Sequence, residues 1–537
     1  MKNVRKLLVV VIAAIVALSG GLVGCGGSSG NADLDDAGVL NIIMPDLGYG
    51  TDWMKAMAAG FTTKTGTKVN VDITPTESSY VTQMRAGTAK YDIYLLRDNT
   101  FNLVTNNAAN YSGYDCILAN YDDIFNSKVD GEDILFKDKM KSTFEIYNRV
   151  YPKYGVDEYH YYAVQWCDSA FSLVRNLDVW QSGWAIPNTT DELLSLAGTI
   201  KSQGYYPFIW SAQASYWWQS ANLWITQYQG YDDMYGKYGF WNGYAEGASA
   251  DSKISADMWM RDGIYYGLEV LDELVKASNG YQHPLSRSVD FTTAQGYFLT
   301  PSQKIAMMSN GDWLYKEMSK NYSNAHIEMI KMPVVSAIIN HPDCENTIAD
   351  DAELSALIKA IDGGSTALTG EGYSVSQKAF NKIYDARTMY TPASNINHVM
   401  VSPSYSDSLD IVKQFYLYMA SDEGLKIYSE SSGGFILEFE TSDSVKQAAL
   451  ATANDFVKST LNVKFNNKCA PWPVYSCRLF SIGGMSVYPT IETGYTYPEL
   501  LFSIEGNGYM NANDLYLLNY QNAISKWSVY LQTAGMS

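Results

Sequence analysis

The chain has 537 residues, too many for one small domain and enough for two or three domains with large cores. Its formal net charge of −19 argues against nucleic acid as a partner, because surfaces that bind DNA or RNA are basic. Aromatic residues make up 14% of the chain, and 15 of them fall within the 40 residues from Tyr205 to Tyr244. Large cores explain only part of this content.

The first 25 residues have the layout of an export signal. Three basic residues precede an apolar run over 7–18, which is short for a membrane-spanning helix. Leu22-Val23-Gly24-Cys25 then resembles the lipobox that precedes the lipidated cysteine of bacterial lipoproteins. We expect residues 1–24 to be a signal peptide and Cys25 to carry the lipid, such as palmitate. An ordinary signal peptide and a single transmembrane anchor are the alternatives.

Residues 25–37 read as the lipidated cysteine and a flexible tether, since Gly26-Gly27-Ser28-Ser29-Gly30 follows directly. Two or more acyl chains on Cys25 would anchor the protein stably. Beyond residue 24, 35 basic residues face 57 acidic ones, a net charge of −22 that helps an exported protein stay soluble. We therefore expect a body held by lipid at the extracytoplasmic face of the cell membrane.

The cysteines give no sign of a metal site. Five remain after Cys25, and none belongs to a CxxC pair or a His/Cys cluster, so we expect no metal and no cofactor. Cys469 and Cys477 could form a disulfide in an oxidising compartment. The odd number leaves at least one free thiol.

The N-terminal part of the body alternates strands and helices. An apolar run over 39–44 predicts a buried strand, and a helix should begin near Thr51 and end at Gly66. Its apolar stripe has spacing i, i+4, i+8: Trp53, Met57 and Phe61. Strands are expected over 69–73 and 92–96, with helix between them. This order predicts a parallel sheet with helices packed on it.

A second α/β region should begin near Ala163. Thr189 and Glu192 form a capping box for a helix that runs to Ile200, and a strand follows over 207–210. Further helices are expected over 258–277 and 408–421.

Seven segments, in order along the chain, resemble the family 1 extracellular solute-binding proteins, which deliver substrates to ABC importers. Arg175 departs from the pattern by replacing the family's common tyrosine. The last hundred residues carry no comparable signature. The matching segments are 61–71, 85–94, 163–176, 186–193, 306–313, 372–376 and 415–424.

The resemblance implies an α/β, two-lobed, periplasmic-binding-protein-like fold of type II. The lobes would be discontinuous, joined by a hinge, and would close on ligand in the cleft between them. We place lobe 1 at about 38–165 and 326–435, and lobe 2 at about 166–325 and 436–537. The implied partners are membrane permease subunits with their ATPase, and we expect a monomer.

The ligand that this resemblance and the aromatic content favour is a carbohydrate, more specifically an oligosaccharide. Sugars offer apolar C–H faces flanked by hydroxyl groups, so their sites combine aromatic platforms with fixed polar side chains. In the second lobe the candidate contacts lie in the 306–313 segment and in the loop after the strand over 207–210. They are Trp313, Asp312, Trp217, Trp218, Tyr216 and Gln213.

Other candidate contacts follow predicted strands or lie between the lobes. Ligands of open α/β sheets bind at the carboxyl ends of strands. We therefore choose Asp46 and Tyr49, which follow the first strand, and Arg97 and Asn99, which follow the third. Trp166 and Asp168 are candidates because they lie in the segment that crosses between the lobes.

An exported carbohydrate-active enzyme is the main alternative. Glycoside hydrolysis needs two carboxylates at a defined separation, and among 57 acidic residues some pair can always be proposed. The sequence has no GxSxG, no HExxH and no Walker A motif, so we expect no catalysis. A surface glycan-binding lipoprotein without a transporter is a third possibility, and a peptide or polyamine ligand is not excluded.

Overall fold

The structure is a computed structural model, in which Gly38–Ser537 form one compact unit. The expected signal peptide, Cys25 and the tether all lie outside the described residues. The described residues are 38–46, 50–75, 77–86, 88–96, 117–150, 158–165, 167–211, 216–231, 255–391, 397–399, 409–470, 479, 500–502 and 508–536.

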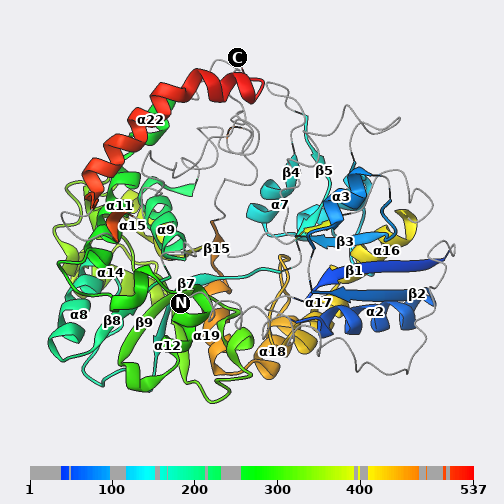
Figure 1. The fold of residues 1–537 in the computed structure, drawn as a ribbon, viewed down its shortest axis with the longest axis horizontal. Coiled ribbons are helices and arrows are strands. Elements are labelled where there is room, and N and C mark those ends of the chain that lie inside the picture. The colour runs from blue at the N-terminus through cyan, green and yellow to red at the C-terminus, as the bar shows by residue number, and fades with distance from the viewer. Residues whose placement is uncertain are drawn as a thin grey trace, which may run out of the picture. The chain divides into compact units, whose positions relative to one another are not determined.

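The first sheet contains five strands in the order β2-β1-β3-β14-β6 (Figure 1). β1 (Val39–Pro45) pairs in parallel with β2 (Lys68–Thr74) and β3 (Ile93–Leu96). β14 (Asn397–Val399) is antiparallel to both β3 and β6 (Val164–Gln165). The predicted parallel strands are confirmed. β14 joins this sheet although it follows β6 by about 230 residues in the sequence.

α2 (Asp52–Thr65) connects β1 to β2 and packs through the predicted stripe. Trp53, Met57 and Phe61 are all fully buried, and Gly66 ends the helix in the left-handed conformation at φ 80°. Trp53 meets Tyr428 of α17 (Asp422–Ser432) at 5.1 Å between ring centroids. The helix therefore joins the first sheet to a helical layer formed by a distant part of the chain.

The second sheet has the order β10-β7-β9-β8. β7 (Phe171–Asn176) lies between β10 (Ile327–Ile330) and β9 (Ile305–Gly311), antiparallel to both, and β8 (Tyr206–Ile209) is parallel to β9. All seven residues of β9 are buried. Both faces of this sheet are therefore covered, which explains its continuous apolar runs.

The other predicted helices form at the expected places with shifted ends. α8 (Thr190–Ser202) begins with the predicted cap, because the Thr189 side chain accepts a hydrogen bond from the Glu192 N–H group. The 258–277 segment forms α11 (Asp262–Val275), and the 408–421 segment forms α16 (Leu409–Met419). Among the described residues, the other helices of eight or more residues are α9 (Trp217–Gln229), α12 (Phe291–Phe298), α14 (Asp351–Asp362), α15 (Gln377–Arg387), α18 (Asp443–Thr452), α19 (Asp455–Lys464) and α22 (Ala512–Thr533).

The chain returns to the first sheet later than the motifs predict. The segment 326–435 was assigned as a whole to lobe 1, but β10 pairs with β7 in the second sheet. α14 and α15 also belong to the hydrophobic core of that sheet. Residues 326–391 therefore belong to the second lobe, because strand pairing and core packing decide lobe membership and the motifs carry no signal for either.

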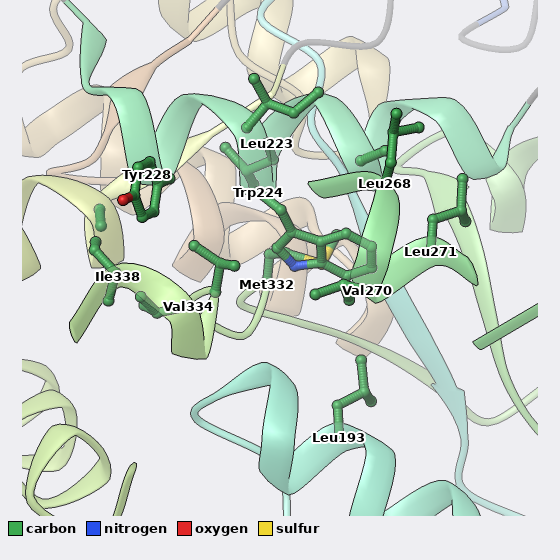
Figure 2. Packing of buried hydrophobic residues seen from close by; sticks show 14 of the residues in the cluster. Leu193, Leu223, Trp224, Tyr228, Leu268, Val270, Leu271, Met332, Val334 and Ile338 are labelled. Atoms are coloured by element: carbon green, nitrogen blue, oxygen red, sulfur yellow. The ribbon is translucent and has the colours of Figure 1, made fainter. Parts of the chain in front are cut away.

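Trp224 lies at the centre of the second lobe's core (Figure 2). It is fully buried, and its indole N–H group donates a hydrogen bond to the Pro333 carbonyl at 3.2 Å. Apolar side chains from three helices and from the segment after β10 surround it. They include Leu193, Leu223, Leu268, Leu271, Met332 and Val334.

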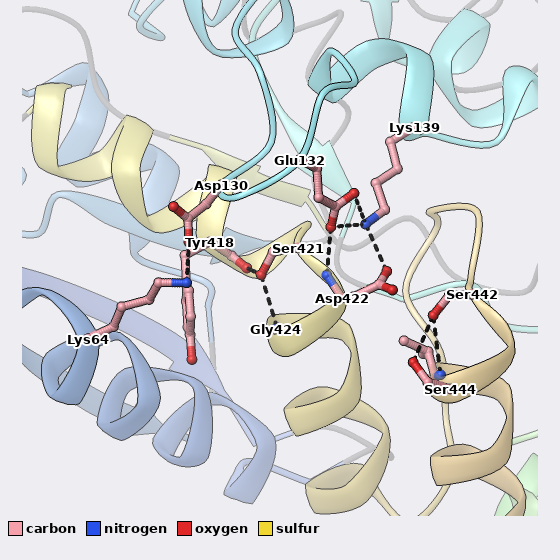
Figure 3. A network of polar contacts seen from close by, with 11 residues as sticks. Lys64, Asp130, Glu132, Lys139, Tyr418, Ser421, Asp422, Gly424, Ser442 and Ser444 are labelled. Carbon is pink, nitrogen blue, oxygen red and sulfur yellow. Dashed lines mark hydrogen bonds and ion pairs between the residues drawn. The ribbon is translucent and has the colours of Figure 1, made fainter.

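A buried ion pair holds part of the first lobe together (Figure 3). Lys139 is 5% exposed and contacts Glu132 at 2.6 Å and Asp422, the first residue of α17, at 3.1 Å. Nearby, Lys64 of α2 contacts Asp130 at 2.6 Å. These contacts tie the 128–139 loop to α17 and α2.

Two further findings concern the sequence expectations. Cys469 is a free, buried thiol, and Cys477, its possible disulfide partner, lies outside the described residues. Among the described residues, no helix is both long enough and apolar enough to span a bilayer.

We predict that Trp224→Ala lowers the free energy of unfolding by about 3–5 kcal/mol, because it leaves a large cavity and removes a buried hydrogen bond. Urea unfolding followed by circular dichroism measures the loss. Val529→Ala, at a position 57% exposed on α22, serves as the control and should change stability by less than about 0.5 kcal/mol. Equal effects of the two substitutions would contradict the role of Trp224.

Candidate functional site

Loops from the two sheets meet where β1 and β9 end. Asp46 directly follows β1 and is exposed, whereas Asp312 and Trp313 directly follow β9. A Cβ atom placed on Gly50, in the loop after β1, would lie 3.4 Å from the Cε atom of Lys316. The carboxyl ends of these two strands therefore face a common region, as expected for a ligand site in this class of sheet.

Four aromatic rings gather at this end of the second sheet. Tyr216 lies 6.3 Å from Trp313 at an interplanar angle of 72°, and 5.6 Å from Phe171 at 82°. Phe171 in turn lies 6.2 Å from Trp313, and Phe291 lies 5.8 Å from Tyr216. Trp313 and Tyr216 are partly exposed, whereas Phe171 is buried beneath them. This aromatic cluster, Phe171, Tyr216, Phe291 and Trp313, is the candidate site.

Gly311 allows the Trp313 ring to lie close to the backbone. A Cβ atom at position 311 would overlap the six-membered ring of the Trp313 indole. The indole therefore packs directly on the end of β9. Any side chain at position 311 would displace the ring.

Polar groups lie beside the cluster. Gln295 of α12 is fully buried and donates a hydrogen bond to Glu317 of α13 (Leu314–Met318) at 2.9 Å. Desolvation raises the pKa of Glu317, and it also raises the pKa of Tyr216 to about 12, with the Glu317 charge adding to the latter shift. Sequence reasoning missed both Gln295 and Glu317, although Glu317 lies one helical turn after Trp313.

The other predicted contacts divide into two groups. Trp217 and Trp218 are the first two residues of α9, directly after Tyr216, but their side chains are not among those described. Five candidates lie outside the described residues and stay predictions. They are Gln213, Trp166, Tyr49, Arg97 and Asn99.

Asp168 and Asp312 are both buried and make contacts inside the protein. Asp312 is fully buried and pairs with the Lys464 ammonium group at 3.0 Å. Asp168 is 1% exposed, accepts hydrogen bonds from the Tyr390 hydroxyl at 2.7 and 2.8 Å, and pairs with Lys141 at 2.5 Å. The sequence could identify these carboxylates but not their internal partners, and their expected role as ligand contacts stays a prediction.

A third buried acid, Glu438, lies close to Asp168. Its Oε1 atom accepts a hydrogen bond from the Gln165 N–H group at 3.0 Å, and its Oε2 atom has no hydrogen-bond partner among the described residues. Burial raises the pKa of Glu438 well above 4.5, and the charge of Asp168 raises it further, against the opposing effects of the Gln165 N–H group and Lys141. Glu438 is therefore the acid in this region that favours its protonated form.

A hollow of about 910 Å³ lies near the opposite end of α9 from Tyr216. Its lining cations have partners close by: Lys378 pairs with Asp343 at 2.5 Å, and Lys382 donates to the Tyr228 carbonyl at 2.5 Å. The 13-residue α9 spans roughly 20 Å, and the hollow shares no residue with the aromatic cluster. We therefore place the candidate site at the cluster. Among the described residues, no three His, Cys, Asp or Glu side chains are grouped so that they could hold a metal ion.

Two solved structures share this fold. One is RafE, an SBP in complex with raffinose, with a TM-score of 0.50 and 14% identity over 90% of this chain and 99% of that chain. Another is a chitin oligosaccharide binding protein, with a TM-score of 0.53 and 14% identity over 92% of this chain and 99% of that chain. The mixed α/β fold expected from the sequence motifs is thereby confirmed over nearly the full length. No protein-family model and no curated protein sequence matches the chain.

We predict that Glu438→Gln stabilises the protein at neutral pH. Folding raises the pKa of this carboxyl group, so the folded protein keeps the proton at pH values above about 4.5, where the unfolded chain loses it. The free energy of unfolding therefore falls as pH rises from about 4.5 toward the raised pKa of the folded state. The amide cannot ionise and still accepts from Gln165. Melting temperatures should match the wild type near pH 4, exceed it near pH 7, and decline less between them.

Glu440→Gln supplies the control, since it removes a carboxylate from an exposed position two residues away. An equal rise in melting temperature for both variants would show that net charge, and not the buried carboxyl group, is responsible.

Proposed function

We propose that this chain is the substrate-binding lipoprotein of an ABC importer and that it captures an extracellular oligosaccharide. The observation that carries the proposal is the aromatic cluster around Trp313, at the strand ends of a solute-binding-protein fold. Trp313 offers a flat apolar surface for the C–H face of a sugar ring, and Tyr216 stands nearly perpendicular to it. Tryptophan and tyrosine combine large contact area with few rotatable bonds, so little entropy is lost on binding.

The polar groups near the cluster suit a ligand rich in hydroxyl groups. Glu317, which accepts a hydrogen bond from the buried Gln295, supplies a carboxylate on the second lobe, and the exposed Asp46 supplies one on the first. The two similar structures are described by the oligosaccharides that they bind, raffinose and chitin oligosaccharide. This supports an oligosaccharide as the ligand class and a binding role over catalysis.

The lipid on Cys25 completes the proposal. A receptor tethered by residues 25–37 would stay concentrated beside its permease, so capture and delivery would take place at one membrane face. Neighbouring genes for two permease subunits would support the coupling to transport. Their absence would favour a surface lipoprotein that binds glycans without an importer.

We predict that Trp313→Ala weakens oligosaccharide binding about tenfold or more, because it removes a central aromatic contact. Isothermal titration calorimetry with raffinose, chitin oligosaccharides, and starch and plant oligosaccharides first identifies a ligand and then measures the loss. Trp180→Ala is the matched control, since Trp180 is a partly buried tryptophan of the same lobe outside the cluster. The platform role is contradicted if Trp313→Ala binds as tightly as the control. Turnover of an oligosaccharide would instead indicate an enzyme.

We predict that Cys25→Ser releases the protein from the membrane. Acyl chains on Cys25 provide the membrane affinity in this proposal, and without them no other anchor is proposed. In a bacterial host, the unaltered chain should fractionate with membranes and incorporate labelled palmitate, whereas the variant should do neither. Membrane association that persists without Cys25 would contradict the lipid anchor.

A further inference from the structure

Lys464, the last residue of α19, connects the candidate site to the segment that crosses between the two sheets. Its side chain is fully buried. The ammonium group contacts the Asp312 carboxylate at 3.0 Å and donates a hydrogen bond to the Asp168 backbone carbonyl at 2.8 Å. One cation thus joins the residue before Trp313 to the crossing segment.

Asp312 also forms hydrogen bonds of its own between the end of β9 and the crossing segment. Its Oδ2 atom accepts a hydrogen bond from the Ala170 N–H group at 3.0 Å, and its own N–H group donates to the Ala170 carbonyl at 2.9 Å. Ala170 lies between β6 of the first sheet and β7 of the second. The end of β9 is therefore attached directly to the crossing segment.

Asp168 extends the connection to the chain's return toward the first sheet. Its carboxylate accepts from the hydroxyl group of Tyr390, in β13 (Met389–Tyr390), which precedes β14 of the first sheet. It also pairs with Lys141, directly before α7 (Ser142–Asn148). A chain of contacts thus links the end of β9 to both connections between the sheets: the segment between β6 and β7, and the segment from β13 to β14.

Buried ion pairs are poor stabilisers. Removing two charges from water costs several kcal/mol per ion, and well-packed apolar side chains in their place are often as stable or more so. The Asp312–Lys464 pair therefore needs a reason beyond stability. Its direct attachment to the residue before Trp313 supplies one.

On the basis of the proposed function, we infer that Asp312 and Lys464 are positioning residues that hold the Trp313 platform at a fixed place relative to the crossing segment. A sugar stacked on Trp313 then acts on a loop that cannot move independently of Ala170. Ligand contact and the geometry of the crossing are thereby coupled through defined bonds.

The variants remove the pair without leaving an isolated buried charge. Asp312→Asn keeps a carbonyl acceptor for the Ala170 N–H group, and Lys464→Met keeps the length and apolar stem of the side chain. The two changes are made together, since Lys464→Met alone would strand the Asp312 charge and could prevent folding.

The matched control is Glu132→Gln with Lys139→Met (Figure 3). This pair has a contact of 2.6 Å, and the Lys139 side chain is 6% exposed. It belongs to the first lobe, and its ion pairs join Glu132, Lys139 and Asp422, none of which is in the aromatic cluster. It reports what loss of a buried ion pair does to the fold alone.

The readout that does not need a ligand is the environment of Trp313. Full-length protein labelled with 5-fluorotryptophan gives a ¹⁹F resonance for Trp313 that is assigned by its loss in a Trp313→Phe variant, among the 13 tryptophans of the chain. In the Asp312→Asn, Lys464→Met protein this resonance should shift and broaden. In the control protein it should stay in place.

The second readout is affinity for whichever of raffinose or the chitin oligosaccharides binds the wild type. Both double variants should remain folded and change the melting temperature by similar amounts, but only the Asp312–Lys464 variant should bind about tenfold or more weakly. An unchanged Trp313 resonance, or affinity equal to that of the control, overturns the inference. If no carbohydrate binds the wild type, the proposed function fails, and the ¹⁹F spectrum still decides the positioning role.

Discussion

The bonds that Lys464 makes to Asp312 and to the Asp168 carbonyl lie where the chain leaves one sheet and enters the next. Backbone groups there have left both ladders, and a buried N–H or C=O group without a partner costs as much as a lost hydrogen bond. Side chains must therefore replace the ladder. Because the same bonds fix the end of β9, the second sheet, the crossing segment and the aromatic cluster share one set of contacts.

The geometry of the aromatic cluster limits how a ligand can sit. One part of the Trp313 indole is occupied by the backbone at Gly311, so a sugar ring can stack only on the surface that remains open. Tyr216 stands at 72° to that ring and forms a corner with it, not a second parallel wall. A corner covers one face of a sugar and one edge, which leaves other hydroxyl groups for the first lobe. The approach of Gly50 to Lys316 brings a first-lobe loop to this corner.

Sequence alone predicted what depends on local pattern. The buried stripe of α2, the cap at Thr189 and the platform position of Trp313 follow from spacing and from family resemblance, and the first two are confirmed. The sequence could not show that β10 pairs with β7, because strand pairing depends on contacts far apart in the chain. For the same reason, the sequence could not show that the Asp312 carboxylate forms an ion pair with Lys464, about 150 residues later.

Buried charge at the crossings adds a constraint of its own. Three acids, Asp168, Asp312 and Glu438, lie within a region that holds two lysines, Lys141 and Lys464. With all five groups ionised, the region would carry one uncompensated negative charge in a low-dielectric interior, where such a charge is expensive. Glu438 has a raised pKa and makes no ion pair among the described residues, so it is the group suited to hold the proton that restores neutrality. The charges at the crossings that carry the candidate site are thus balanced internally.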